Sequence, residues 1–209
     1  MIYCISDIHG CYDEFLQLLE KINFTPEDMI YFLGDAIDRG KEPIKCLLYV
    51  METPNIHMLM GNHELMMIDA LLNPDDMDAV YHWMRNGGEC TLRQFLELGE
   101  EDRVKVMEYI EKLPLLENVK VGEQNYVLVH AGLNVAGLSK ANCVSTETVL
   151  PKQNPDDLLW IREKFFRKKA LPKSITIFGH TNVSYIKGYT SNKVWRDEDY
   201  KDKIGIDGG

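Results

Sequence analysis

The sequence contains no run of apolar residues long enough to cross a lipid bilayer. Its first seven residues also lack the basic start and the long apolar core of a secretory signal peptide. The five cysteines, an odd number, include no Cys-x-x-Cys pair, so a disulfide framework is not indicated. These absences predict a cytoplasmic protein with free thiols and no membrane partner.

Positive charge is also scarce, because 23 lysines and arginines face 33 acidic residues and the formal net charge is −10. An acidic surface repels a phosphate backbone, so we expect no nucleic-acid partner. The same charge means that an anionic substrate has to be attracted locally, by a metal ion or an arginine.

The sequence also lacks internal repeats, linkers and low-complexity segments. With 209 residues, of which 45% are hydrophobic, the chain is long enough to bury a substantial core. We therefore predict a single domain that covers residues 1–209.

The first part of the chain alternates short apolar runs with segments of helical periodicity. The runs predict strands, and the periodic segments predict helices between them. Such β-α-β units imply parallel strands joined by right-handed crossovers, so the residues that follow these strands share one edge of a sheet. The expected strands cover 2–6, 29–33 and 56–60, and the expected helices cover 13–21, 43–51 and 65–72.

The rest of the chain mixes helical and strand patterns. Residues 73–112 have helical patterns interrupted at 73–76 and 86–88, which predicts a helical insertion or cap beside the sheet. Residues 133–154 predict a loop. The remaining expected elements are a hairpin of strands over 118–121 and 126–129, a helix from 156 to 166, a strand over 175–178 and short strands that end with 204–206.

Five predicted strands end beside side chains that can bind a metal ion. Oxygen and imidazole ligands without thiolates suit manganese, iron or zinc rather than a structural cysteine–zinc site. One histidine is a weak signal, but four of the six histidines lie near glycine at strand ends, whereas His57 and His82 do not and are expected to be ordinary polar residues. The ligand-type residues at the strand ends are Asp7 with His9, Asp35, Asn62, His130 and His180.

Residues 34–40 concentrate charge directly after the second strand. Their sequence is Gly34-Asp35-Ala36-Ile37-Asp38-Arg39-Gly40, with two carboxylates three residues apart and an arginine. Aspartate and glycine are common in turns, so the stretch taken alone is equally consistent with an ordinary turn. Its position past a strand end, however, is where open α/β sheets place ligand sites.

Five motifs follow one another along residues 7–181: Asp7-Ile8-His9-Gly10, the stretch 34–40, Gly61-Asn62-His63-Glu64, His130-Ala131-Gly132 and Gly179-His180-Thr181. In this order they resemble the signature of the calcineurin-like metallophosphoesterases. The longer Asp-Arg-Gly and Asn-His-Glu forms are similar to the phosphoprotein phosphatase branch, which includes bacterial and phage Ser/Thr phosphatases and symmetrical diadenosine tetraphosphate hydrolases. The resemblance implies an α/β (α+β) fold, a four-layer α-β-β-α sandwich with a dinuclear metal site.

The resemblance also implies which residues would hold the metal ions. Asp7 and His9 would bind the first ion, and Asp35 would bridge both. The second ion would be bound by Asn62, His130 and His180.

Four further residues receive catalytic or substrate-binding roles from the resemblance. His63 would be the general acid, Asp38 would orient it, and Arg39 would hold the substrate phosphate. Arg162 would be a second phosphate-binding arginine, matched only through the short segment Trp160-Ile161-Arg162. The alternative for Arg162 is a surface charge on a helix, since exposed arginines are common.

The residue types agree with these roles. Two metal ions can deprotonate a water molecule, and a carboxylate such as Asp35 has the two oxygens needed to bridge them. Arginine offsets charge on phosphoryl oxygens. A leaving group needs a proton, and histidine titrates near neutrality. No base is evident that would activate Cys4, Ser6 or Cys11 as a nucleophile.

The sequence departs from the family pattern in two places. Met60 stands where family phosphatases commonly have an arginine. Met60→Arg is predicted to restore a phosphate ligand and to raise kcat/KM on simple monoesters several-fold. The alternative is that Met60 belongs to the core, where an arginine would destabilise the fold. The sequence also stops at Gly209, where relatives usually continue with another strand.

The sequence therefore predicts a phosphoester hydrolase that uses a metal-activated hydroxide and two divalent transition metal ions, with manganese favoured over iron or zinc. A Ser/Thr-type protein phosphatase acting on phosphoproteins is the favoured activity. Symmetrical diadenosine tetraphosphate hydrolysis is the alternative, and its adenine would need an aromatic surface. A non-catalytic phosphate sensor or scaffold is disfavoured, because binding alone needs no general acid. The residues that could stack on adenine are Trp83, Trp160, Tyr185 and Tyr189.

Overall fold

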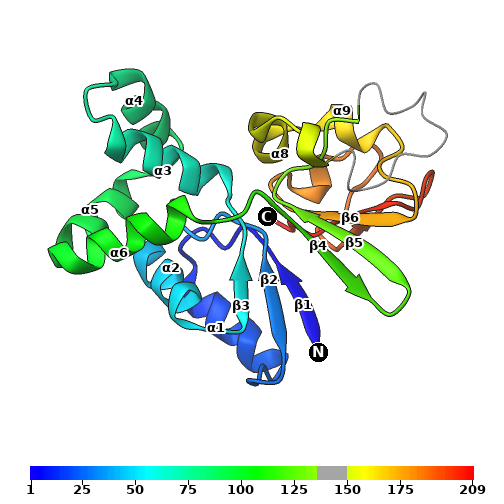
Figure 1. The fold of residues 1–209 in the computed structure, drawn as a ribbon, viewed down its shortest axis with the longest axis horizontal. Helices are drawn as coiled ribbons and strands as arrows, with labels where there is room; N and C mark the ends of the chain where they lie inside the picture. The colour runs from blue at the N-terminus through cyan, green and yellow to red at the C-terminus, as the bar shows by residue number, and fades with distance from the viewer. Residues whose placement is uncertain (136–149) are drawn as a thin grey trace. The chain divides into compact units, whose positions relative to one another are not determined.

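The computed structural model describes residues 1–135 and 150–209 (Figure 1). The chain divides into two compact units, Met1–Pro114 and Leu115–Gly209, and each has its own sheet. The single domain predicted for residues 1–209 stays a prediction. Most of the loop predicted for 133–154 lies outside the described residues.

The first unit contains a parallel three-stranded sheet. Its strands are β1 (Ile2–Ile5), β2 (Met29–Phe32) and β3 (Ile56–Met58), in the order β1-β2-β3. The connecting helices are α1 (Tyr12–Lys21) and α2 (Pro43–Glu52). The β-α-β-α-β pattern predicted from the sequence is confirmed, with each strand one or two residues shorter than expected.

The strand residues explain why this sheet forms where it does. In β2 the side chains of Ile30 and Phe32 are fully buried and alternate with partly exposed neighbours. Phe32 contacts Phe15 of α1 edge to face, with the ring centroids 6.2 Å apart. Pro43 begins α2, where a missing N–H costs nothing. The sheet and its helices thus hold the strand ends, and the loops after them, on a packed core.

The predicted helical insertion is present, with one more break than expected. It follows α3 (Asn62–Leu72), and its helices are α4 (Met77–Arg85), α5 (Glu89–Glu97) and α6 (Glu100–Glu111). The predicted interruptions near 73–76 and 86–88 are confirmed, and a further one separates α5 from α6. The predicted start of α3 at residue 65 is wrong, because Asn62 already begins the helix and Glu64 caps it by accepting a hydrogen bond from the Gly61 N–H (3.1 Å).

The second unit contains a five-stranded mixed sheet in the order β4-β5-β6-β8-β7. A two-residue turn joins the antiparallel strands β4 and β5. Strand β6 pairs in parallel with β5 and with β8, and β7 pairs antiparallel with β8. The hairpin is therefore longer than predicted and its turn is shorter. The strands are β4 (Leu116–Val121), β5 (Gln124–Val129), β6 (Ser174–Phe178), β7 (Trp195–Arg196) and β8 (Lys203–Gly205).

The single helix predicted from 156 to 166 is wrong, because it is two short helices. They are α8 (Pro155–Trp160) and α9 (Glu163–Phe166), separated by Ile161 and Arg162. Asn154, rather than the two aspartates after it, caps α8 by accepting a hydrogen bond from the Asp156 N–H (3.1 Å). Ile161 has extended dihedral angles, and its side chain packs with Phe165 in the core of this unit. Arg162 therefore lies at a break rather than on a helix face.

Within the described ranges, no helix is long and apolar enough to span a membrane. Four cysteines there have free thiols, while Cys143 lies outside the described residues. Burial raises the pKa of Cys4 to about 11 and that of Cys46 to about 12. Neither thiol is therefore a ready nucleophile at neutral pH.

Candidate active site

The loops that follow β1 and β2 run side by side and bring their polar residues together. Three backbone N–H groups of the first loop donate to carbonyls of the second: Asp7 to Gly34 (3.1 Å), His9 to Asp35 (3.0 Å) and Gly10 to Ala36 (2.8 Å). The pairing of the parallel strands thus continues past their ends. It places the Asp7-Ile8-His9-Gly10 motif against the stretch 34–40, as expected for one edge of a parallel sheet.

Backbone strain is concentrated at the predicted site residues. The described part of the chain has nine non-glycine residues with positive φ. Each costs on the order of 1–3 kcal/mol and persists only where the surrounding structure fixes it, which is common at functional sites. Six of the nine are predicted site residues, namely Asp7, His9, Asp35, Asp38, Arg39 and His180.

Glu64 holds the loop after β2 in this strained form. Its carboxylate is fully buried and accepts hydrogen bonds from the backbone N–H groups of Asp35 (2.8 Å), Ala36 (2.9 Å) and Ile37 (3.4 Å). Burial, with a contribution from the charge of Asp38, raises the pKa of Glu64 to about 7. Glu64 has no predicted role from the sequence. Its position three residues after Gly61, at a helix start, is the capping-box signal that could have found it.

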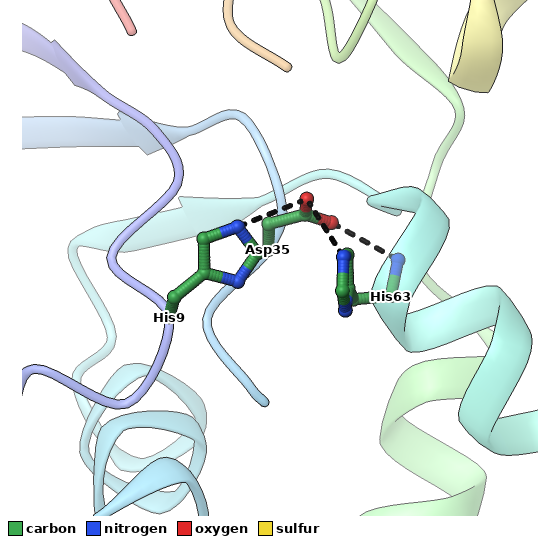
Figure 2. Close-up of side chains that lie close together, drawn as sticks. All are labelled: His9, Asp35 and His63. Atoms are coloured by element: carbon green, nitrogen blue, oxygen red, sulfur yellow. Dashed lines mark hydrogen bonds and ion pairs between the residues drawn. The ribbon is translucent and has the colours of Figure 1, made fainter. Parts of the chain in front are cut away.

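His9, Asp35 and His63 lie close together, with both imidazole rings turned toward the carboxylate (Figure 2). The Oδ2 atom of Asp35 is 3.6 Å from His9 Nε2 and 4.0 Å from His63 Nε2. The backbone N–H of His63, in the first turn of α3, donates to Oδ1 of Asp35 (3.0 Å). One atom from each side chain can be chosen so that all lie within 4.8 Å of one another, which is close enough to share a metal ion.

The chemistry of this cluster fits a divalent cation. His9 donates its Nδ1 proton to the carbonyl of Ile37 (2.9 Å), so its Nε2 carries a lone pair. Burial and the neighbouring His63 and Arg39 lower the pKa of His9 to about 4, which keeps the imidazole neutral. Burial, together with the charges of Glu64 and Asp7, raises the pKa of Asp35 well above its usual value. A bound cation would relieve this crowding of negative charge.

His63 and Asp38 form a buried pair. His63 donates from Nδ1 to Oδ2 of Asp38 (2.6 Å), and the two side chains are 1% and 0% exposed. The exposed residue Arg39 donates to Nε2 of His63 and to Nε2 of His9, both at 2.9 Å. The predicted partners are therefore in contact, whereas their roles as acid, orienting group and phosphate ligand remain predictions.

Asp7 and Asn62 complete the predicted residues of the first unit. Asp7 is partly exposed and follows β1, and Asn62 is buried at the start of α3. Gly61, just before Asn62, lies so close to Asp35 that a Cβ atom would be 2.3 Å from its Oδ1. The glycine of this motif thus lets the start of α3 approach the Asp35 carboxylate.

The second unit brings His130 and His180 together. His130 directly follows β5, His180 follows β6 by one residue, and the Gly179 N–H donates to the His130 carbonyl (2.8 Å). His130 Nε2 and His180 Nδ1 are 3.2 Å apart, and the rings meet edge to face. Two imidazole nitrogens at this spacing suit ligands of one metal ion.

Arg162 is tied to the same strand end. Its Nη1 donates to Thr181 Oγ1 (2.9 Å) and to the His180 carbonyl (3.3 Å). The Trp160 ring contacts His180 edge to face, with centroids 5.8 Å apart. The short segment that carries the match to Arg162 thus packs against His180. Arg162 is exposed at the start of α9, and its role as a phosphate ligand stays a prediction.

Met60 is 8% exposed and packs in the core of the first unit. We therefore expect Met60→Arg to lower the stability by about 3 kcal/mol or more, since it buries a charge that has no partner. It should give no gain in kcat/KM on simple monoesters. Thermal denaturation and steady-state kinetics on the same preparation measure both effects.

The matched control for this variant is Met77→Arg, because Met77 is 69% exposed on α4. It should leave the melting temperature nearly unchanged. A rise in kcat/KM for Met60→Arg at a constant melting temperature would instead support a missing phosphate ligand.

Comparison with known proteins agrees with this geometry. The family model for calcineurin-like phosphoesterases matches residues 1–207. The chain is 29% identical over 208 residues to serine/threonine-protein phosphatase 2 of Salmonella typhimurium, an alignment covering 94% of this chain and 86% of that protein. It is also 29% identical over 140 residues to the symmetrical bis(5'-nucleosyl)-tetraphosphatase of Haemophilus ducreyi, which covers 63% of this chain but only 45% of that protein.

A solved structure shares the fold. A protein serine/threonine phosphatase from Saccharomyces cerevisiae superposes with a TM-score of 0.58 at 17% identity, over 99% of this chain and 66% of that one. The predicted mixed α/β metallophosphoesterase fold is confirmed.

Proposed function

The chain belongs to the calcineurin-like phosphoesterase family and is a phosphoester hydrolase, and on this premise we propose that it is a dinuclear metalloenzyme that dephosphorylates proteins at serine or threonine. The observation that carries the metal-dependent mechanism is the cluster of His9, Asp35 and His63 beside the buried Asp38. Its nitrogen and oxygen atoms suit a divalent ion, and its histidine–carboxylate pair suits proton transfer.

The metal ligands are assigned as the family resemblance implies. Asp7 and His9 would hold one ion, Asp35 both, and the second ion would be held by Asn62, His130 and His180. When bound, the ions supply a hydroxide nucleophile near neutral pH and offset negative charge on the phosphoryl oxygens. The lone pair that His9 turns toward Asp35 and the facing imidazoles of His130 and His180 support the assignment.

Arg39 and His63 would act on the substrate itself. Arg39 donates to Nε2 of His63, so its guanidinium lies against the ring nitrogen that is not bonded to Asp38. A phosphate oxygen would draw the guanidinium away and leave Nε2 able to take a proton from solvent water. Asp38, bonded to Nδ1, would stabilise the resulting imidazolium, which would protonate the leaving alkoxide. Arg162, exposed beside His180, would be the second phosphate ligand.

The preference for a phosphoprotein rests on the extent of the two alignments. The Ser/Thr phosphatase matches over 86% of its own length, whereas the tetraphosphatase matches over less than half of its own. One candidate for stacking on adenine is also removed, because Trp83 is 1% exposed and donates its N–H to Asp38. Diadenosine tetraphosphate hydrolysis is the second candidate, since a 35% identical segment of 101 residues matches the Haemophilus influenzae tetraphosphatase.

A side-by-side assay with Mn²⁺ tests the proposal. Phosphoserine and phosphothreonine peptides, diadenosine tetraphosphate and p-nitrophenyl phosphate would be compared by kcat/KM. We expect the phosphopeptides to exceed diadenosine tetraphosphate by about tenfold or more. The reverse order, with ADP as product, would assign the second candidate. Repeating the assay with Fe²⁺ and Zn²⁺ identifies the preferred metal.

A further inference from the structure

Asp38 receives most of its hydrogen bonds from the helical insertion rather than from the signature motifs. The Thr91 hydroxyl donates to its Oδ1 (2.5 Å), and Trp83 Nε1 donates to its Oδ2 (3.0 Å). The Asp38 backbone N–H in turn donates to Thr91 Oγ1 (3.0 Å). His63 is the other side chain that donates to this carboxylate.

The hydrogen bonds of Trp83 and Thr91 to Asp38 are buried. Asp38 and Thr91 are 0% exposed and Trp83 is 1% exposed. A buried carboxylate keeps its charge and its orientation only if its oxygens accept hydrogen bonds, and hydrogen bonds to charged groups are the strong ones. Trp83 and Thr91 therefore fix the direction in which Asp38 presents Oδ2 to His63.

The turn between α4 and α5 also contacts Arg39. The Arg39 backbone N–H donates to the Gly87 carbonyl (3.1 Å), and its Nε lies 3.5 Å from the Asn86 carbonyl. Gly87 has a φ of +101°, and a Cβ atom on it would be 2.9 Å from Arg39 Cγ. Only glycine fits this turn without moving the arginine.

We infer that the segment from Trp83 to Thr91, here called the α4–α5 clamp, positions two groups of the reaction separately. Trp83 and Thr91 would orient the general-acid pair through Asp38, and Gly87 would hold the strained backbone of Arg39 for phosphate binding. The inference rests on the proposed function, because it needs His63 as the acid. It makes the helical insertion a positioning element, where the sequence predicted only a cap that packs beside the sheet.

The two halves of the clamp predict different kinetic signatures. Thr91→Val removes the hydroxyl at nearly constant volume, so kcat on a phosphopeptide, whose leaving group is poor, should fall by about tenfold. The rate on p-nitrophenyl phosphate should change little, because its leaving group needs less protonation. Gly87→Ala should instead raise KM for both substrates. Thr91→Ser keeps the hydroxyl and should restore the rate.

A double-variant cycle tests whether Thr91 acts through Asp38. Adding Thr91→Val to Asp38→Asn should cause no further loss, since groups that act as a unit are not additive. Thr53→Val is the matched control, because it removes a hydroxyl bonded to the Tyr49 carbonyl at the end of α2, away from the site. Trp83→Phe is a second variant that removes only one donor.

His63→Asn, run in the same assays, distinguishes a failure of the clamp inference from a failure of the proposed mechanism. If His63→Asn is selective for poor leaving groups and Thr91→Val is not, the clamp inference is wrong and the proposed mechanism stands. If His63→Asn lowers both rates equally, the general-acid assignment fails and the inference fails with it. Equal losses for Thr91→Val and Thr53→Val would also overturn the clamp.

Discussion

Replacing His63 with asparagine is expected to lower kcat on phosphopeptides by roughly 10²–10⁴-fold, the usual range for a general acid. The structure gives the physical reason, because the His63 side chain is 1% exposed and bonded at Nδ1 to Asp38. Asparagine keeps the start of α3 but cannot carry the proton to the leaving group. The rate on p-nitrophenyl phosphate should fall much less. Steady-state kinetics on both substrates, at saturating Mn²⁺, measure the difference.

The metal content of this variant decides whether His63 is an acid or a ligand. His63 lies within the group of side chains close enough to share an ion, although the family resemblance does not make it a ligand. We expect His63→Asn to keep the metal content of the unaltered protein. A variant isolated without metal would show that His63 is a ligand. His57→Asn, an exposed histidine in β3, is the control for the substitution itself.

The strand-end arrangement of the first unit could be predicted from sequence because local signals agree there. Short apolar runs gave β1, β2 and β3, and each run stops at a polar motif. Since parallel strands end at one edge, the contact between the loops carrying His9 and Asp35 follows from topology alone. The strain of these loops could not be predicted, because positive φ at Asp7, Asp35 or Asp38 is fixed by tertiary contacts.

The predicted helix boundaries are wrong where a motif of the candidate site forms part of the helix end. Asn62 and His63 were expected before the helix, but the carboxylate of Glu64 caps the backbone and lets α3 begin at Asn62. In the second unit the apolar pattern continues through Ile161, and the break at Arg162 coincides with its hydrogen bonds to Thr181 and the His180 carbonyl. The spacing of apolar residues predicts which face of a helix is buried. It does not predict a helix end that is set by a polar side chain bonded to another strand.

The supporting residues were missed because their partners are distant in sequence. Trp83 and Thr91 meet Asp38 across 45 and 53 residues, and neither belongs to a recognisable motif. Trp83 was considered as a surface for adenine, whereas the structure buries it against a carboxylate. The groups predicted to touch substrate or metal are therefore visible in the sequence, and the groups that contact them from the helical insertion become visible only in the fold.

Removal of divalent metal is expected to reduce hydrolysis of every phosphoester substrate to the background rate. Burial, together with the charges of Glu64 and Asp7, raises the pKa of Asp35, so a bound cation would stabilise the charged form of this carboxylate. We expect elemental analysis of an active preparation to give two transition metal ions per chain. Activity should vanish in a chelator and return with Mn²⁺.

Metal binding should also stabilise the fold, which provides a second readout that does not depend on turnover. A ligand at a thousandfold excess over its Kd stabilises the native state by about 4 kcal/mol, so Mn²⁺ should raise the melting temperature of chelator-treated protein. Asp35→Asn should lose most of this shift, because it removes the carboxylate assigned to both ions. Asp102→Asn, on the exposed face of α6, should keep it. Full activity in protein without bound metal, assayed in chelator, would contradict the metal-dependent mechanism, and an equal shift in both variants would contradict the role of Asp35.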